Sequence, residues 1–363
     1  MSTSLKNIHS FKKNFPLYDN DGKCVLSAKF TNKGNISNLK QLIREGKLIL
    51  IENHCMCKNE HTEQDIVISE KDRYGFAIPQ VLCSKCGLIR SRFVFDEISN
   101  SVFYANYYRG IYAQNIDKPM DSLWNDQYNR GLRILNFIKN IISLDDISNL
   151  SEIGTGMGGV LMPFKEVGFH VSGCDFDERY IEYGKQKGLD LYCGSFYDFT
   201  CDDSCDLIIL CHVLEHYLDP IKELKKILPK LKNNRYLYVE VPGIFSISKT
   251  YKNPLLYFQN AHVYNFYKDF LWTFFESLGL YVVYGDEVCR FVVQKKSKDI
   301  PNIETIYTNN LSNYPTIIAN YLINAQTVWR KERFLLFIRK VANSLGLNYP
   351  IKLMSYLLKH FIV

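Results

Sequence analysis

Three glycines and two acidic residues form the most chemically informative pattern of this chain. The run Glu152-Ile-Gly-Thr-Gly-Met-Gly158 follows a short apolar stretch and precedes a helix-like one. Its glycines allow a sharp turn from a strand into a helix, and they let a ligand approach the first helical NH groups. Asp175 ends the next expected strand, residues 170–175, where a carboxylate can accept hydrogen bonds from ribose hydroxyls. The pattern therefore predicts a nucleotide-like ligand.

The identity of that ligand depends on what surrounds the glycines. Gly154, Gly156 and Gly159 also satisfy Gly-x-Gly-x-x-Gly, so a nicotinamide dinucleotide is an alternative. Glu152 favours S-adenosyl-L-methionine, because a carboxylate is unfavourable beside a pyrophosphate and compatible with the ammonium and sulfonium charges of this donor. Residues 280–294 read as two strands joined by a Gly-Asp turn. Such an antiparallel ending is unusual for a dinucleotide domain.

With these motifs the chain resembles the class I S-adenosylmethionine-dependent methyltransferases. The resemblance rests on the glycine loop, Asp175, the Val213-Leu-Glu-His216 and Asp219-Pro220 segment and the final hairpin, and it covers residues 121–297. It implies an α/β fold with a Rossmann-like, seven-stranded sheet. It also implies that seven residues hold the methyl donor: Glu152, Gly154, Gly156, Gly158, Asp175, Ser195 and Phe196.

Four cysteines show the spacing of a metal site. Cys55-x-Cys57 and Cys83-x-x-Cys86 are separated by residues 58–82, and a glycine follows the last thiol. Two such turns can supply four thiolates to a tetrahedral zinc ion, and a module of this size needs its metal to fold. We therefore predict a structural Zn²⁺ in a zinc-ribbon-like module. His54 or His61 is an alternative ligand, because one residue between the first two cysteines is tighter than the usual two.

A cysteine module, an aromatic segment and a methyltransferase core in this order resemble the sugar-modifying members of the family. The resemblance implies that the module and residues 103–109 help to close over the acceptor. Oxygen is the expected methyl acceptor, because the chain lacks the large carboxy-terminal domain of the C-methyltransferases and has Val213 where some have a catalytic tyrosine. A hydroxyl must lose its proton, and a histidine is the natural general base.

Among the histidines, His216 is the first candidate for this base, because it matches the Glu-His pair of the sugar enzymes. Glu215 is expected to orient His216 or to contact the acceptor. His212 is the second candidate base and His262 the third. All four residues follow expected strands of the sheet, residues 205–211 and 235–241, at the edge where class I enzymes bind their substrates.

The chain divides into five expected segments. These are a lead-in over residues 1–50, the zinc-ribbon-like module over 51–98, an aromatic linker or lid over 99–120, the donor-binding domain over 121–297 and a basic helical tail over 298–363. Leu132, Leu135, Ile138 and Ile142 form one apolar stripe, which predicts a helix over residues 121–143. Strand-like and helix-like patterns then alternate to the end of the domain, as expected of an α/β fold.

Composition indicates a globular protein, since 47% of the residues are hydrophobic. The first ten residues lack the apolar core of a signal peptide, so we expect a cytoplasmic location. From Pro301 onward the tail carries seven basic residues against Glu304 and Glu332, and thus most of the net charge of +6. Its segments 332–345 and 351–363 read as basic amphipathic helices, suited to packing on the core, to a homodimer or to peripheral contact with an anionic membrane.

Two other functions are compatible with the sequence. A nucleic-acid methyltransferase would account for a zinc ribbon and basic helices, but basic residues avoid the ribbon and the Asn-Pro-Pro-Tyr and paired-cysteine signals of base methylation are missing. A nonenzymatic zinc-containing interaction protein with a degenerate Rossmann core is the second alternative. We expect a small-molecule or glycan acceptor, and no nucleic-acid partner.

Overall fold

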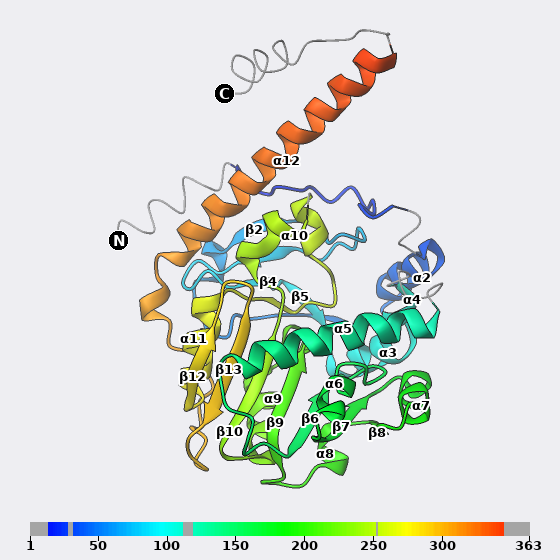
Figure 1. Cartoon of the computed structure of the whole chain (residues 1–363). Coiled ribbons are helices and arrows are strands. Elements are labelled where there is room, and N and C mark those ends of the chain that lie inside the picture. The colour runs from blue at the N-terminus through cyan, green and yellow to red at the C-terminus, as the bar shows by residue number, and fades with distance from the viewer. Residues whose placement is uncertain (1–13, 28–31, 112–118, 252, 345–363) are drawn as a thin grey trace.

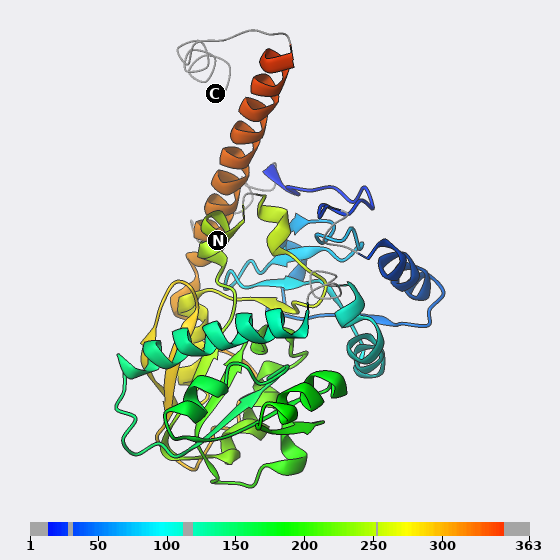
Figure 2. The same ribbon diagram turned by 45° about the vertical axis from the view of Figure 1, so that its right-hand side comes forward.

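A large sheet flanked by helices, a small sheet beyond its edge and one projecting helix make up the protein (Figure 1). The computed structural model describes residues 14–27, 32–111, 119–251 and 253–344. Three strands of the small sheet and its neighbouring helices come from the first third of the chain, and the large sheet comes from residues 149–295 (Figure 2).

The large sheet has seven strands in the order β12-β13-β10-β9-β6-β7-β8. The strands are β6 Asn149–Ile153, β7 His170–Asp175, β8 Asp190–Cys193, β9 Cys205–Cys211, β10 Leu231–Glu240, β12 Leu280–Gly285 and β13 Arg290–Lys295. The strands from β10 to β8 run parallel, and β13 pairs antiparallel with both β10 and β12. The predicted Rossmann-like, seven-stranded α/β fold with an antiparallel ending is confirmed.

Helices cover both faces of this sheet, so its central strand is apolar on both sides. They are α5 Met120–Lys139, α6 Met162–Glu166, α7 Glu178–Gln186, α8 Phe196–Phe199, α9 Pro220–Ile227 and α11 Lys268–Ser277, whereas α10 Ile247–Thr250 lies beside the small sheet (Figure 1). Along β9, Leu207 and Ile209 pack with α5 and α7, whereas Ile208 and Leu210 pack with α9 and α11. The predicted stripe on α5 is correct for Leu135 and wrong for Leu132, which is 38% exposed.

The amino-terminal module is joined to the large domain through a shared sheet. Its elements are α2 Lys33–Arg44, β1 Leu50–Glu52, β2 Ile66–Ser69, β3 Gln80–Leu82, β4 Ile89–Ser91, β5 Phe93–Phe95, α3 Glu97–Asn106 and α4 Tyr108–Ile111. Strands β2, β3 and β4 form an antiparallel sheet whose fourth strand is β11, Tyr264–Asn265, from the large domain. The module and the large domain therefore share one core, with Leu82 and Phe266 in the same cluster.

The described part of the tail ends in one long helix, α12, Tyr314–Ser344. Its first part packs on the body through Ile318, Ala319 and Leu322, which are buried. Its later part projects away from the body (Figures 1 and 2), and Phe337 there is 63% exposed. The helix predicted over residues 332–345 is thus the end of a longer one, and the segment 351–363 lies outside the described residues. No helix in the described part of the chain is long and apolar enough to cross a membrane.

Candidate active site

The glycine loop lies at the carboxyl end of β6 and forms the expected turn toward α6. Gly154 and Gly156 have φ angles of 69° and 58°, in the left-handed region that favours glycine. A Cβ atom on Gly154 would lie 2.7 Å from Val213 Cγ2, and one on Gly156 would lie 2.6 Å from Gln127 Nε2. The backbone angles therefore favour glycine at both positions, and the rigid Val213 side chain also leaves no room for a Cβ atom on Gly154.

Asp175 lies next to this loop at the end of β7. Its Oδ2 accepts a hydrogen bond of 2.9 Å from the backbone NH of Gly156. Its Oδ1 also lies 3.3 Å from the Arg109 guanidinium of α4, and the same guanidinium is stacked 4.5 Å from the centre of the Tyr180 ring. Sequence reasoning missed Arg109 at this position, because no local pattern links two residues that are 66 positions apart.

Glu152, the acidic residue of the loop motif, is buried in β6. Its Oε2 accepts a 2.6 Å hydrogen bond from the Thr155 hydroxyl. Burial raises the pKa of Glu152 to about 8, so its carboxyl group is mostly neutral at pH 7 unless a cation lies beside it. Glu152 therefore carries the negative charge expected to favour a cationic donor only when that donor is bound beside it.

The residues after β8 occupy the start of α8. Ser195 caps this helix, since its hydroxyl accepts a hydrogen bond from the backbone NH of Tyr197. The ring of Phe196 is buried and packs against Phe199. In contrast, the ring of Phe176, directly after Asp175, is 73% exposed. The ring of Phe176 thus offers an aromatic surface beside Asp175. The sequence analysis did not single out Phe176.

Three histidines surround the carboxylate of Glu215. This side chain is 2% exposed, and neither of its oxygens has a hydrogen-bond partner in the described part of the chain. Its Oε1 lies 3.4 Å from His212 Nδ1, 3.8 Å from His262 Nε2 and 3.9 Å from His216 Nε2. The structure therefore brings together all four polar residues that the sequence singled out after β9 and β10.

The imidazole of His216 is held in one orientation. Its Nδ1 lies 3.0 Å from the Ala261 carbonyl oxygen and 3.0 Å from the Tyr104 hydroxyl. Since a carbonyl oxygen only accepts hydrogen bonds, Nδ1 carries the proton and Nε2 keeps a lone pair. Burial lowers the pKa of His216 below its ordinary value, against the opposing effect of Glu215. At neutral pH the ring is thus an uncharged base with Nε2 free to accept a proton.

The other two histidines differ in environment. His212 is 37% exposed, has a φ of 58° and lies with Nε2 3.9 Å from Glu240. A left-handed conformation is uncommon for residues other than glycine, and such conformations are concentrated at functional sites. Glu240 is already paired with Arg133 at 2.9 Å. His262 is buried against the Gln259 side chain, and burial lowers its pKa well below the ordinary value.

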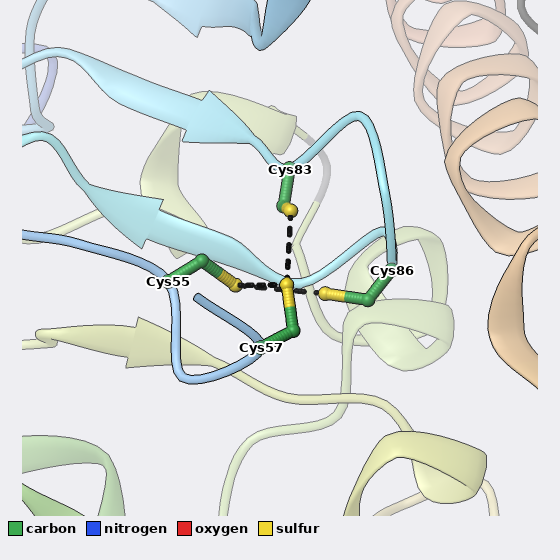
Figure 3. Close-up of side chains that lie close together, drawn as sticks. All are labelled: Cys55, Cys57, Cys83 and Cys86. Carbon is green, nitrogen blue, oxygen red and sulfur yellow. Dashed lines mark hydrogen bonds between the residues drawn. The ribbon is translucent and has the colours of Figure 1, made fainter. Parts of the chain in front are cut away.

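The four predicted cysteines meet in the amino-terminal module (Figure 3). The sulfur atoms of Cys55 and Cys86 are 3.5 Å apart, those of Cys55 and Cys57 also 3.5 Å, and those of Cys57 and Cys83 3.6 Å. A disulfide would require about 2.05 Å. Tetrahedral zinc with bonds of about 2.3 Å places its sulfurs about 3.8 Å apart. Four buried thiols at these distances fit a zinc ion.

The two histidines considered as alternative zinc ligands lie outside this cluster. His61 is exposed, and its Nδ1 lies 3.4 Å from Glu63. His54 contributes its backbone carbonyl, which accepts a hydrogen bond from the Tyr264 hydroxyl. The four cysteines thus form the ligand group without either histidine.

Part of the chain is similar to known methyltransferase domains. Residues 127–284 match the model of a family described as a methyltransferase domain. An S-adenosylmethionine-dependent methyltransferase of Methanosarcina mazei is 17% identical, with 45% of this chain and 98% of that chain covered and a TM-score of 0.36. One from Archaeoglobus fulgidus is 20% identical, with 56% and 87% covered and a TM-score of 0.36. No curated protein sequence matches the chain.

Proposed function

We propose that the methyltransferase domain of this chain transfers a methyl group from S-adenosyl-L-methionine to a hydroxyl of a nucleotide sugar or surface glycan. The family match over residues 127–284 supports methyl transfer. The observation that carries the proposed acceptor is the buried carboxylate of Glu215, whose oxygens have no hydrogen-bond partner among the described residues and which lies beside the uncharged His216. Such a pair is suited to bind and deprotonate a hydroxyl group.

The residues around β6, β7 and β8 fit the donor. Gly154 is exposed, Gly156 and Gly158 are buried, and all three have the positive φ angles that favour glycine. Asp175 offers acceptor oxygens for the ribose hydroxyls, and Glu152 becomes a counter-charge when the donor's cationic end binds. Ser195, Phe196 and the exposed ring of Phe176 would border the adenine.

The chemistry demands little beyond alignment and removal of one proton. When bound, S-adenosylmethionine supplies a methyl group on a sulfonium that needs no further activation. His216 takes the hydroxyl proton on Nε2, while Ala261 holds its Nδ1–H and fixes the ring. Glu215 accepts a hydrogen bond from the acceptor and stabilises the imidazolium that forms. His212, which is more exposed, is the second candidate base.

A second set of unpaired polar atoms favours a polyhydroxyl acceptor. Both the Nδ2 and the Oδ1 of Asn260 are buried without a partner in the described residues. Asn260 precedes Ala261 and His262, which contact His216 and Glu215. Buried polar atoms are usually hydrogen-bonded, so a donor and an acceptor left unpaired here call for a ligand with both. Sugar hydroxyls supply both.

Comparing the native host's glycans and nucleotide sugars with and without the gene, by mass spectrometry, tests this proposal. Loss of one methyl group from a sugar is the expected result. An unchanged sugar profile together with a methyl group lost from RNA or DNA would instead establish the nucleic-acid alternative.

The tail supports a further proposal, that α12 makes peripheral contact with an anionic membrane. Its projecting part carries Arg330, Lys331 and Arg333 beside the exposed Phe334 and Phe337. Basic and apolar residues together bind anionic lipid surfaces. Liposome flotation with and without residues 330–363 checks it, and equal flotation of the two proteins would refute the proposal.

A further inference from the structure

We propose that the zinc-ribbon-like module is part of the catalytic apparatus, and that Ser91 of β4 positions His216 through the backbone of residues 261–263. This inference rests on the proposed function, because it concerns the proposed base. It assigns Ser91, which contacts neither donor nor acceptor, the role of a positioning residue. It also gives the cysteine cluster a role in turnover.

On the module side, Ser91 holds residues 262 and 263 by two hydrogen bonds. Its backbone NH donates to the Val263 carbonyl at 3.0 Å, and its hydroxyl donates to the His262 carbonyl at 2.9 Å. Ser91 is fully buried, and Gln80 Nε2 donates to its hydroxyl at 2.9 Å. The hydroxyl proton is thereby directed at His262, because the oxygen's acceptor side is already used.

On the catalytic side, the same short segment holds the residues proposed to do the chemistry. The Val263 NH donates to the Glu215 carbonyl at 2.9 Å. The Ala261 carbonyl accepts from His216 Nδ1 at 3.0 Å. Residues 261–263 therefore lie between β4 and the 3-10 helix Leu214–His216, with hydrogen bonds to both. A displacement of this segment moves the acceptor of the His216 proton.

The cysteine cluster fixes the hairpin that carries Ser91. Cys83 and Cys86 lie in the turn between β3 and β4, so a metal ion held there sets the relative position of Gln80 and Ser91. Tyr267, directly after β11 and Phe266, donates its hydroxyl to the Cys86 carbonyl. The module is thus tied to the large domain on both sides of the 261–263 segment.

His216 is also faced by groups from other elements. Tyr104 of α3 and Tyr108 of α4 lie with ring centres 6.2 and 5.9 Å from it. Arg109, His212, Glu215 and His262 act on it electrostatically or by contact. Among these groups only His262 accepts a hydrogen bond from Ser91, and His262 belongs to the 261–263 segment. An effect of Ser91 on His216 must therefore pass through residues 261–263.

The test compares Ser91→Ala with Ser69→Ala in the full-length, zinc-loaded protein. Ser69 is a matched control, because it is an equally buried serine of the same sheet whose hydroxyl bonds to Lys71 at 2.6 Å instead. Zinc content and thermal unfolding verify that both variants fold. Gln80→Met has a similar volume and removes the hydrogen bond that Gln80 donates to the Ser91 hydroxyl. We expect it to lower kcat as Ser91→Ala does, but by a smaller factor.

Two measurements test the positioning role of Ser91, namely kcat and the NMR resonance of the His216 Nδ1 proton. We expect Ser91→Ala to lower kcat about fivefold, the effect of weakening one hydrogen bond, and to leave donor affinity within about twofold. We also expect the NMR resonance of the His216 Nδ1 proton, assigned with His216→Asn, to move in Ser91→Ala and to stay in place in Ser69→Ala. An unmoved resonance in Ser91→Ala, or the same change in Ser69→Ala, would overturn the inference.

The NMR readout needs no acceptor, so it separates this inference from the proposed function. A shifted resonance in a protein that methylates no sugar would refute the proposed function and leave the positioning role intact. If the protein methylates a sugar and the resonance does not shift, the positioning role of Ser91 is refuted and the proposed function stands.

Discussion

Arg109 of α4 lies against Asp175 of β7, with its guanidinium 3.3 Å from Oδ1. The acid expected to bind ribose is thus already paired with a cation from the aromatic linker. Because ribose hydroxyls would compete with this cation, we predict that Arg109→Gln tightens donor binding about two- to fivefold, as expected for a partly exposed ion pair. Calorimetric titration with S-adenosylmethionine measures it.

Arg179→Gln is the control for that change, because Arg179 pairs with Asp177 at 3.1 Å and does not reach Asp175. Its donor affinity should equal that of the wild type. Weaker binding in Arg109→Gln would show instead that Arg109 helps to hold the donor.

Glu152 should make donor binding pH-dependent. Its raised pKa of about 8 leaves it protonated in the free protein at pH 7, and a bound cation favours the ionised form. Binding therefore releases a proton, and affinity rises with pH up to about 8 and then levels off. Calorimetry in buffers of different ionisation enthalpy counts the protons. The difference between wild type and Glu152→Gln isolates this residue, and equal proton release by both would contradict the prediction.

His216 should be needed for turnover and dispensable for donor binding. His216→Asn keeps a donor for the Ala261 carbonyl but removes the base, whereas His216→Ala removes both. We expect either change to lower kcat by about 10²- to 10⁴-fold with donor affinity unchanged. His170→Asn, at the exposed start of β7, is the control. Near-normal turnover in His216→Asn would exclude this histidine as the base and leave His212.

The lowered pKa of His216 sets the acid limb of the activity profile. A general base acts only when unprotonated, and burial lowers its pKa below the ordinary 6.5. We therefore expect the midpoint of the decline in kcat with falling pH to lie below 6.5. A midpoint above 6.5 would point to another group.

The cysteine cluster should bind about one zinc ion per chain. Cys83→Ser removes one of four converging thiolates, so we expect zinc content and melting temperature to fall together. Cys193→Ser changes an exposed cysteine outside the cluster and should alter neither. Metal analysis by mass spectrometry and thermal unfolding measure both. Full zinc content in Cys83→Ser would contradict the predicted ligand set.

Local patterns predicted much of the fold. The strands β7 and β9 begin and end where the sequence predicted, because apolar runs bounded by glycine, acidic or polar residues are local signals. The cysteine spacing likewise predicted a cluster that the fold brings together. Asp219, next to the Pro220 that starts α9, caps this helix, with its carboxylate accepting a hydrogen bond from the Lys222 NH. These features depend on residues close in the chain.

Contacts between distant segments could not be predicted. Tyr104 meets His216 across 112 positions, and β11 of the large domain completes the sheet of the amino-terminal module. Such pairings depend on how the two parts pack, and no periodicity encodes them. The exposure of Leu132 could not be predicted for the same reason. The apolar stripe predicts that α5 is a helix, but it does not predict how much of that helix the sheet covers. The site was thus predicted as separate residues, and its connections came from the structure.

Calorimetric titration of the wild-type protein and Asp175→Ala with S-adenosylmethionine tests the central claim most directly. The account predicts saturable binding of one donor per chain by the wild type, strongly weakened in Asp175→Ala, and no binding of NAD. Absence of binding by the folded, zinc-loaded wild-type protein, or equal binding by Asp175→Ala, would contradict it.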